Sequence, residues 1–349
     1  MGKVLEAAGL GTRLGAESAG RVEAPPYDPR RDRETGILNP AGLEEFSLRL
    51  ADAVLAELHR GRFPIVLGGD CSNLIGCALA LRRLGRFGVF FLDGHADFYQ
   101  PEAEPSGEVA SMDLAIVSGH GPAVLTDIEG RGPLVREEDI VAFGYRDTEQ
   151  QREHGSQDIR TTAIHVFPLN EVRKPTVAAT AGTAARLLLG SGVEGIWIHV
   201  DADVLDDRIM PAVDYRLPGG LSWEELSAAL RAVMETGKVV GLNVGIFNPT
   251  LDPGGAIARP LVECLVEGLM SSRGNARDLL GSRWSYSRRS LAGLGMTEEP
   301  VTASAPRRAP CTVKRSCSTR QSGPRRADSP TPAASARRRA PEGSPPPHR

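Results

Sequence analysis

Apolar residues along the first 270 positions follow two alternating spacings. Short continuous apolar runs predict buried strands at 63–67, 88–92, 140–144, 163–167, 195–200 and 239–247. Between these runs, apolar residues recur at helical spacing, which predicts helices at 41–60, 72–84, 176–189, 223–236 and 261–270. Buried strands that alternate with helices are typical of a mostly parallel sheet covered on both faces. We therefore expect a three-layer α/β/α fold.

The alternation covers residues 41–275, and the segments on either side differ in composition. Residues 1–40 are rich in Gly, Pro and Arg, and breakers such as Pro25-Pro26 predict an irregular N-terminal segment. Residues 276–349 are dominated by Ala, Arg, Pro and Ser, a composition that cannot bury a core and predicts a disordered tail. The chain is thus expected to hold one α/β domain with two flanking segments.

The tail is strongly basic, although the chain as a whole is not. Residues 281–349 contain 14 Lys and Arg against 4 Asp and Glu, whereas the net charge of the chain is −3. We favour a dispensable extension over a basic arm that binds acidic partners. A further hypothesis is a shifted reading frame, because GC-rich DNA read out of frame encodes a similar composition rich in Arg, Ala, Pro and Ser.

Composition narrows the class of protein. The overall charge does not favour a nucleic-acid partner, and no apolar run approaches the ~20 residues that a membrane span needs. The five cysteines are odd in number and lack the spacing of a zinc motif or a disulfide framework. We therefore expect a cytoplasmic protein with reduced cysteines.

The apolar run at 88–92 ends in three side chains that can bind a metal. Asp93, His95 and Asp97 lie at positions i, i+2 and i+4. Because side chains two apart on an extended strand point to the same face, these three are expected to converge where the strand leaves the sheet. Two carboxylates and an imidazole there predict half of a metal site.

Two further strand ends carry the other half. Asp201 and Asp203 alternate in the same way after the run at 195–200. The turn Gly68-Gly69-Asp70-Cys71-Ser72 closes the first strand, and Ser72 is expected to cap the next helix. Because sites in parallel sheets form beyond the carboxyl ends of strands, the three ends together predict a centre for two divalent ions.

In order and separation, these motifs resemble the signatures of the ureohydrolase family, of arginase and agmatinase type: Gly-Gly-Asp-His-Ser, Asp-Ala-His-x-Asp and Ser-x-Asp-x-Asp-x-x-Asp-Pro. The counterparts here are residues 68–72, 93–97 and 199–207. The resemblance covers roughly residues 40–272. It implies an arginase-like three-layer fold with two bridged Mn²⁺ ions, a small-molecule substrate and a homo-oligomer, trimeric or hexameric.

The resemblance also implies a ligand set and a reaction. By position, Asp93 and Asp201 bridge the ions, Cys71 and Asp97 complete one ion, and His95 and Asp203 complete the other. The implied reaction is hydrolysis of a C–N bond in a guanidino, N-hydroxyguanidino or formimino compound by hydroxide generated between the ions. Asp97 is the implied proton relay, and His95 is grouped with it as a catalytic residue.

Cys71 stands where the family has a histidine ligand. A thiolate is softer than imidazole, so it favours Zn²⁺, Fe²⁺ or Co²⁺, although Mn²⁺ remains the first expectation. The alternative is that Cys71 acts as a small buried apolar residue and leaves one ion weakly held.

Other departures fall on the residues expected to choose the substrate. The counterpart of the family loop Gly-Asn-x-His-Gly-Met is residues 107–112, with Ala110 in place of the proton-shuttling histidine. His120 or His154 is a candidate substitute; the alternative is that each is a surface histidine without a role in the site. Ile246 replaces the glutamate that pairs with the substrate guanidinium, which argues against plain arginine or agmatine. Glu149 is the expected contact for a substrate amino group; the alternative is a solvated loop carboxylate. Two functions remain open: hydrolysis of a less basic substrate, or a catalytically weak metal-binding relative with a structural or regulatory role.

Overall fold

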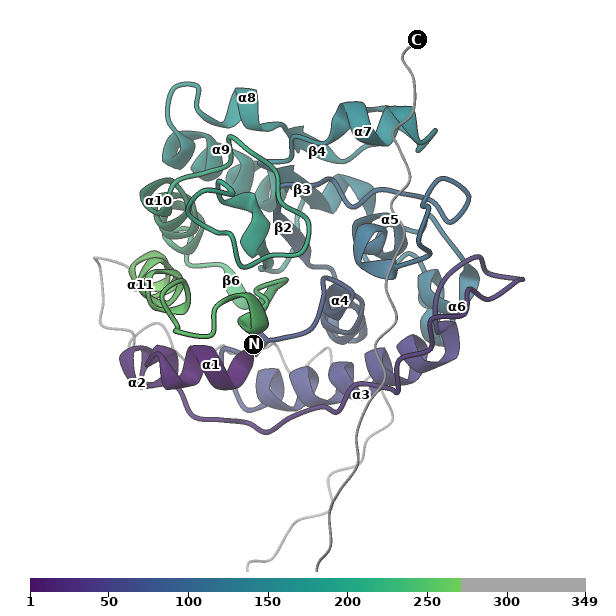
Figure 1. The fold of residues 1–349 in the computed structure, drawn as a ribbon, viewed down its shortest axis with the longest axis horizontal. Coiled ribbons are helices and arrows are strands. Elements are labelled where there is room, and N and C mark those ends of the chain that lie inside the picture. The colour runs from purple at the N-terminus through teal and green to yellow at the C-terminus, as the bar shows by residue number, and fades with distance from the viewer. Residues whose placement is uncertain (271–349) are drawn as a thin grey trace, which may run out of the picture. The chain divides into compact units, whose positions relative to one another are not determined.

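The computed structural model describes residues 1–270, in which six strands form one parallel sheet (Figure 1). Their order across the sheet is β1-β6-β5-β2-β3-β4. Their bounds are β1 (Ile65–Leu67), β2 (Gly88–Leu92), β3 (Ile140–Phe143), β4 (His165–Phe167), β5 (Ile196–Asp201) and β6 (Val239–Gly245). The expected α/β class and parallel sheet are confirmed.

Helices cover both faces of the sheet. On one face lie α9 (Val177–Gly190), α10 (Trp223–Met234) and α11 (Ala258–Leu269); on the other lie α3 (Pro40–His59), α4 (Asn73–Leu84) and α5 (Asp113–Val117) (Figure 1). Strand side chains alternate between the two apolar cores: Phe90 faces the first set of helices, while Val89 and Phe91 face the second. The three-layer arrangement follows, because a buried strand must cover both of its faces.

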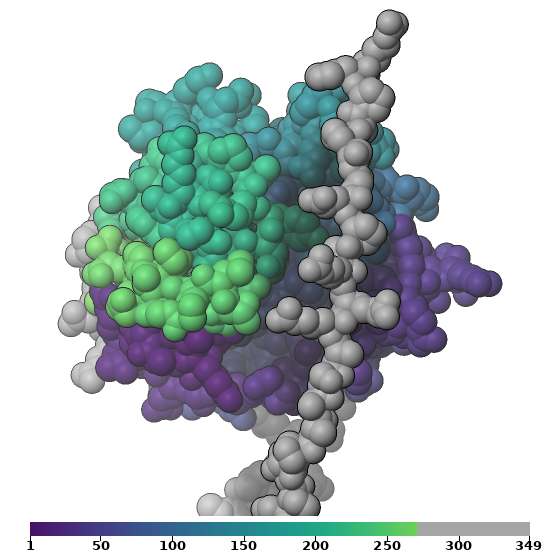
Figure 2. Space-filling view, in the orientation of Figure 1, coloured from purple at the N-terminus to yellow at the C-terminus, as the bar shows by residue number. Residues whose placement is uncertain are grey.

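The first 14 residues of the N-terminal segment differ from their prediction, whereas residues 16–30 contain no helix or strand. Residues expected to be irregular form two short helices, α1 (Gly2–Ala7) and α2 (Leu10–Leu14). Both helices contact α11 and lie below it in the view of Figure 2. Gly9 and Gly15, with φ of 95° and 65°, are the N-cap and C-cap of α2, so these glycines bound a helix rather than prevent one. Three apolar side chains of this segment are buried in the core: Leu5, Leu10 and Leu14.

Shorter helices lie in the connections, with bounds α6 (Ala123–Thr126), α7 (Thr148–Glu153) and α8 (Leu169–Val172). Among the longer helices, α10 begins with a capping box, in which Ser222 and Glu225 each accept a hydrogen bond from the other's backbone N–H. The expected cap on α4 is wrong in detail: the Ser72 hydroxyl donates to Asp70 and leaves the helix N–H groups alone.

The strand order reverses direction between β2 and β5. The chain proceeds from β2 to β3 and β4 on one side, and β5 and β6 lie on the other, so β2 and β5 are neighbours at the topological switch point. Ligands of open α/β sheets bind beyond the carboxyl ends of strands at such a point. Within residues 1–270, no helix is long and apolar enough to cross a membrane. The predicted disordered tail, 276–349, lies outside the described residues.

Candidate metal centre

The motif residues meet at the switch point. Asp93 directly follows β2, Asp201 is the last residue of β5, and the carboxyl ends of these paired strands lie side by side. Cys71 lies in the turn that follows β1, and β6 separates β1 from β5 in the sheet. All three side chains are buried.

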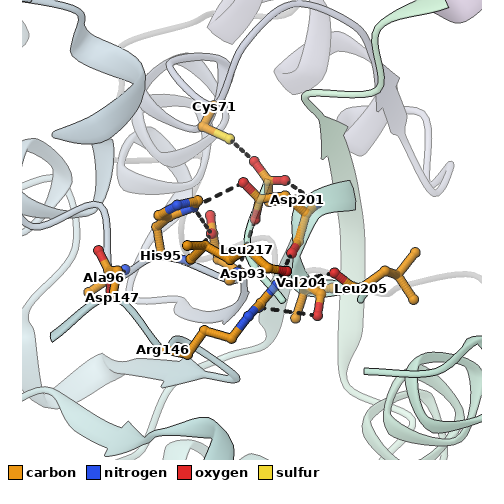
Figure 3. Close-up of polar contacts among 12 residues, drawn as sticks. Cys71, Asp93, His95, Ala96, Arg146, Asp147, Asp201, Val204, Leu205 and Leu217 are labelled. Atoms are coloured by element: carbon orange, nitrogen blue, oxygen red, sulfur yellow. Dashed lines mark hydrogen bonds and ion pairs between the residues drawn. The ribbon is translucent and has the colours of Figure 1, made fainter. Parts of the chain in front are cut away.

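Glycines allow Cys71 to reach across β6. Gly68 and Gly69 turn the chain with φ of 135° and 63°, values that favour glycine. A Cβ at Gly245 would lie 3.2 Å from the Cys71 sulfur, so a side chain at the end of β6 would crowd the thiol. The thiol donates a hydrogen bond to Asp201 Oδ2 over 2.8 Å (Figure 3). This contact places the sulfur among the carboxylates.

The ligand-type atoms fall into three overlapping groups, within each of which they lie no more than 4.8 Å apart. The groups are Asp93–His95–Asp203, Cys71–Asp97–Asp113 and Cys71–Asp93–His199–Asp201. The structure thus brings together the six side chains that the sequence nominated, and whether they ligate metal stays a prediction. It adds two residues that sequence reasoning missed, Asp113 and His199.

His95 is held by a carboxylate. Its Nδ1 lies 2.9 Å from Asp203 Oδ2, and burial, which lowers the pKa of His95, is outweighed by Asp203 and Asp93, so that the pKa rises to about 9. The same contact lowers the pKa of Asp203 against the opposing effect of burial. In the metal-free protein His95 is therefore a cation, and metal binding at this group must displace its proton.

Asp97 and Asp113 form an acidic pair beside Cys71. Asp97 has φ of 43°, a conformation in which non-glycine residues are strained, and its backbone carbonyl accepts from Ala115 N–H of α5. Burial, followed by the neighbouring carboxylates, raises the pKa of Asp97 and of Asp113 well above the usual range. The sequence held one sign of Asp113 that could have been used: a charged residue begins a helix whose other residues are apolar.

The residues present fit divalent cations. Five carboxylates are buried around the site, at positions 93, 97, 113, 201 and 203. Within the described chain, Asp93 Oδ2 and both Asp113 oxygens are buried without a hydrogen-bond partner. Clustered buried carboxylates repel one another, so cations are the partners that this donor set lacks.

The unneutralised cluster predicts a pH dependence of stability for the metal-free protein. Burial and Asp203 raise the pKa of Asp93 from 3.8 to about 6, and that of His95 rises from 6.5 to about 9, so both groups bind protons more tightly in the folded chain. Stability is therefore expected to fall as pH rises through about 4 to 6 and again through about 6.5 to 9, by on the order of 2–3 kcal/mol for each group. Calorimetry of chelator-treated protein from pH 5 to 9 measures this; a Tm that climbs across the range would contradict it.

A chain of hydrogen bonds sets the proton position on His199. The Trp197 indole N–H, which can only donate, bonds to Asn243 Oδ1 over 2.8 Å. The Asn243 amide nitrogen must then donate to His199 Nδ1, also over 2.8 Å, which leaves the ring proton on Nε2 in the neutral form. Nε2 lies 3.8 Å from Asp93 Oδ2 and is buried without another partner in the described residues. His199, which stacks on Phe91, is thus a proton donor facing Asp93 rather than a metal ligand.

This network predicts a specific tautomer. The nitrogen-15 NMR spectrum of metal-free protein is expected to show His199 protonated at Nε2, and Asn243→Asp, which accepts from both neighbours, is expected to move the proton to Nδ1. A wild-type spectrum with the Nδ1–H form would contradict the assignment.

Arg146 explains the glycine in the first acidic motif. Its Nη2 donates to the backbone carbonyls of Asp203, Leu205 and Leu217 over 2.9, 3.2 and 2.9 Å (Figure 3). A Cβ at Gly94 would lie 2.5 Å from Arg146 Nη1 and 2.6 Å from the Asp203 carbonyl oxygen, so the alanine of the family signature does not fit this arrangement. The guanidinium orients the chain that carries Asp203.

Other nominated residues lie apart from these three groups. Glu149, on α7, is exposed and paired with Arg152, so its role in substrate binding stays a prediction. His120 pairs with Glu137 over 2.7 Å, and His154 Nδ1 contacts the Tyr99 hydroxyl over 3.0 Å. Each imidazole already has a partner, which favours neither as a replacement for the histidine missing at Ala110.

The fold and the site together define an α/β protein with a candidate two-metal centre at its switch point. A sequence model of the arginase family matches residues 11–270, which is most of the chain. The chain belongs to the arginase family, whose members are metal-dependent ureohydrolases that use paired manganese ions. The match begins about 30 residues before the region covered by the motif resemblance and includes part of α2.

Individual relatives agree with this assignment. The arginases of Staphylococcus aureus (strain MRSA252) and Bacillus caldovelox are 28% identical over 233 residues and 31% identical over 221 residues. These alignments cover 66% and 63% of this chain and 76% and 72% of the relatives. The crystal structure of the Bacillus cereus arginase superposes with a TM-score of 0.68 at 26% identity, over 78% of this chain and 92% of that one.

Proposed function

We propose that the chain is a two-metal hydrolase that cleaves a C–N bond in a substrate less basic than a plain guanidinium, either a linear amidine such as an N-hydroxyguanidino or formimino compound, or a ureido compound. The observation that carries the proposal is the convergence of five buried carboxylates, some with unpartnered oxygens in the described chain, at the switch point of an arginase-family sheet. The relatives named arginase support hydrolysis as the reaction.

The residues divide between two ions. Asp93, His95 and Asp203 would hold one, and Cys71 and Asp97 the other, with Asp201 between them. When bound, such a pair lowers the pKa of a shared water toward neutrality and polarises the carbon under attack. His199 Nε2 faces Asp93 Oδ2 at 3.8 Å, and Arg146 orients the chain at Asp203.

We assign to Asp97 the transfer of a proton from the attacking water to the leaving amine. Its carboxylate oxygen would take a proton from the attacking water and deliver it to the departing amine nitrogen as the C–N bond breaks. Burial and the charges of Asp93 and Asp113 raise its pKa, so it holds a proton more readily than an exposed aspartate. With Ala110 in the loop, the leaving group receives no histidine, which favours substrates whose amine leaves readily.

The residue at the position expected to contact the substrate guanidinium supports a less basic substrate. Ile246 has φ of 63° at the position where the family's glutamate meets the guanidinium, and its N–H donates to the Gly69 carbonyl over 3.3 Å. A buried cation beside an apolar side chain lacks its partner, which costs several kcal/mol. The same substitutions favour a second candidate, a metal-binding relative with little turnover.

An activity panel separates these candidates. Guanidino, N-hydroxyguanidino, formimino and ureido compounds are supplied with Mn²⁺ or Zn²⁺, and release of the urea, hydroxyurea, formamide or ammonia is measured. We expect kcat/KM to be highest for the less basic compounds and to vanish in Asp203→Ala. Absence of turnover with every compound, or turnover unchanged in Asp203→Ala, would refute the enzyme and leave the second candidate.

A further inference from the structure

Asp113 is absent from the ligand set that the family signatures imply. It is nevertheless the carboxylate of the site for which both oxygens lack a hydrogen-bond partner in the described chain. Its side chain is fully buried. Buried polar groups in folded proteins are nearly always paired. In the ionised form, a carboxylate in this state lacks a cation partner, and without one its raised pKa favours the protonated form.

The surroundings of Asp113 show where that cation would sit. One carboxylate oxygen of Asp113 lies within 4.8 Å of both the Cys71 sulfur and an oxygen of Asp97. Such spacing is compatible with three ligands around one ion, since metal–ligand bonds of 2.0–2.3 Å place neighbouring donors about 3–4.5 Å apart. No arginine or lysine forms an ion pair with Asp113 in the described chain.

We propose that Asp113 is a ligand of the divalent ion that Cys71 and Asp97 would hold, and that its oxygen offsets the soft sulfur that Cys71 brings in place of the family's histidine. The inference rests on the metal binding of the proposed function and extends its ligand set. Beside Cys71, Asp97 and the shared Asp201, Asp113 would add one more carboxylate, and a donor set richer in oxygen accepts Mn²⁺ more readily than the same set without it.

The position of Asp113 supports this exchange. It opens α5, directly after the loop 107–112 that lost its histidine at Ala110. The adjoining helix is anchored to the site, because Ala115 N–H donates to the Asp97 carbonyl over 3.2 Å. The loop thus lacks the family's histidine at Ala110, and the residue that follows the loop, Asp113, would supply a side chain to the ion.

The test compares wild type with Asp113→Asn, which keeps the shape and removes the charge. Isothermal titration of chelator-treated protein with Mn²⁺ and with Zn²⁺ gives stoichiometry and affinity. We expect wild type to bind two Mn²⁺ ions, and Asp113→Asn to bind the second at least tenfold more weakly, with a smaller loss for Zn²⁺. In the Co²⁺-loaded variant, the sulfur-to-cobalt charge-transfer band of Cys71 should weaken.

A thermal measurement distinguishes ligation from a structural role. The metal-free Asp113→Asn protein should melt at or above the temperature of metal-free wild type, because a buried unpaired carboxylate has been removed, while its rise in Tm on adding Mn²⁺ should be smaller. The matched control is Asp139→Asn, a buried carboxylate paired with Arg86 at the opposite, amino end of β3. It should lower Tm and leave the metal-induced rise unchanged.

The outcomes separate the two proposals. Equal Mn²⁺ stoichiometry and affinity in wild type and Asp113→Asn would overturn the inference and leave the proposed function intact. A metal-free Tm below wild type with an unchanged metal-induced rise would overturn it in favour of a structural role. A wild-type protein that binds no divalent ion would refute the proposed function itself.

Discussion

Asp93→Asn is expected to lower kcat/KM by about 10³-fold, because it removes the carboxylate that touches more of the site than any other. Asp93 belongs to two of the ligand groups, and its Oδ2 faces His199 Nε2. Loss of the ion-supported water activation removes several kcal/mol of transition-state stabilisation, and each 1.36 kcal/mol is a factor of ten. Steady-state rates with the best substrate of the panel, at saturating Mn²⁺, measure the effect.

Stability provides the second readout for Asp93→Asn. Burial and Asp203 raise the pKa of Asp93 to about 6, so the ionised group destabilises the metal-free fold at pH 8. The variant should therefore melt higher than wild type without metal and gain less from Mn²⁺. Asp139→Asn serves again as the control that loses stability but retains activity. Wild-type kcat/KM in Asp93→Asn would exclude Asp93 from the centre.

Most of the fold could be predicted because its four central strands, β2, β3, β5 and β6, are fully buried. Such strands are continuous apolar runs, and the run at 88–92 coincides with β2. The helices α1 and α2 were missed because each is too short for a periodic pattern and is held by packing of Leu5, Leu10 and Leu14 against the core. Local composition carries no trace of that packing.

Some site residues could likewise be predicted from a local sequence motif, whereas others depend on contacts between distant segments. Asp93, His95 and Asp97 were found because they lie within one motif at a strand end, although the strand alternation expected for them is wrong: β2 ends at Leu92, and His95 and Asp97 belong to different ligand groups. The roles of Asp113 and His199 depend on other parts of the chain: Asp113 reaches Asp97 through the docking of α5, and the proton on His199 is set by Asn243 of the neighbouring strand. Contacts between distant segments decide both, so spacing alone did not show them.

Ile246→Glu is expected to convert the substrate preference toward guanidinium compounds. Position 246 adjoins the turn that carries Cys71, since its N–H bonds to the Gly69 carbonyl. Hydrogen bonds to charged groups contribute about 1.5–3 kcal/mol, so KM for an arginine-like substrate should fall about 10- to 100-fold. The unbranched glutamate should also fit φ of 63° with less strain than isoleucine.

The neutral isostere decides whether charge is the cause. Ile246→Gln keeps the size and the relief of strain but cannot form the ion pair, so it should leave KM for the guanidinium near its wild-type value. Adding Ala110→His to Ile246→Glu should then raise kcat, because the leaving amine regains an acid, with little further change in KM. Equal gains in the Gln and Glu variants would show that space, not charge, governs the substrate at this position.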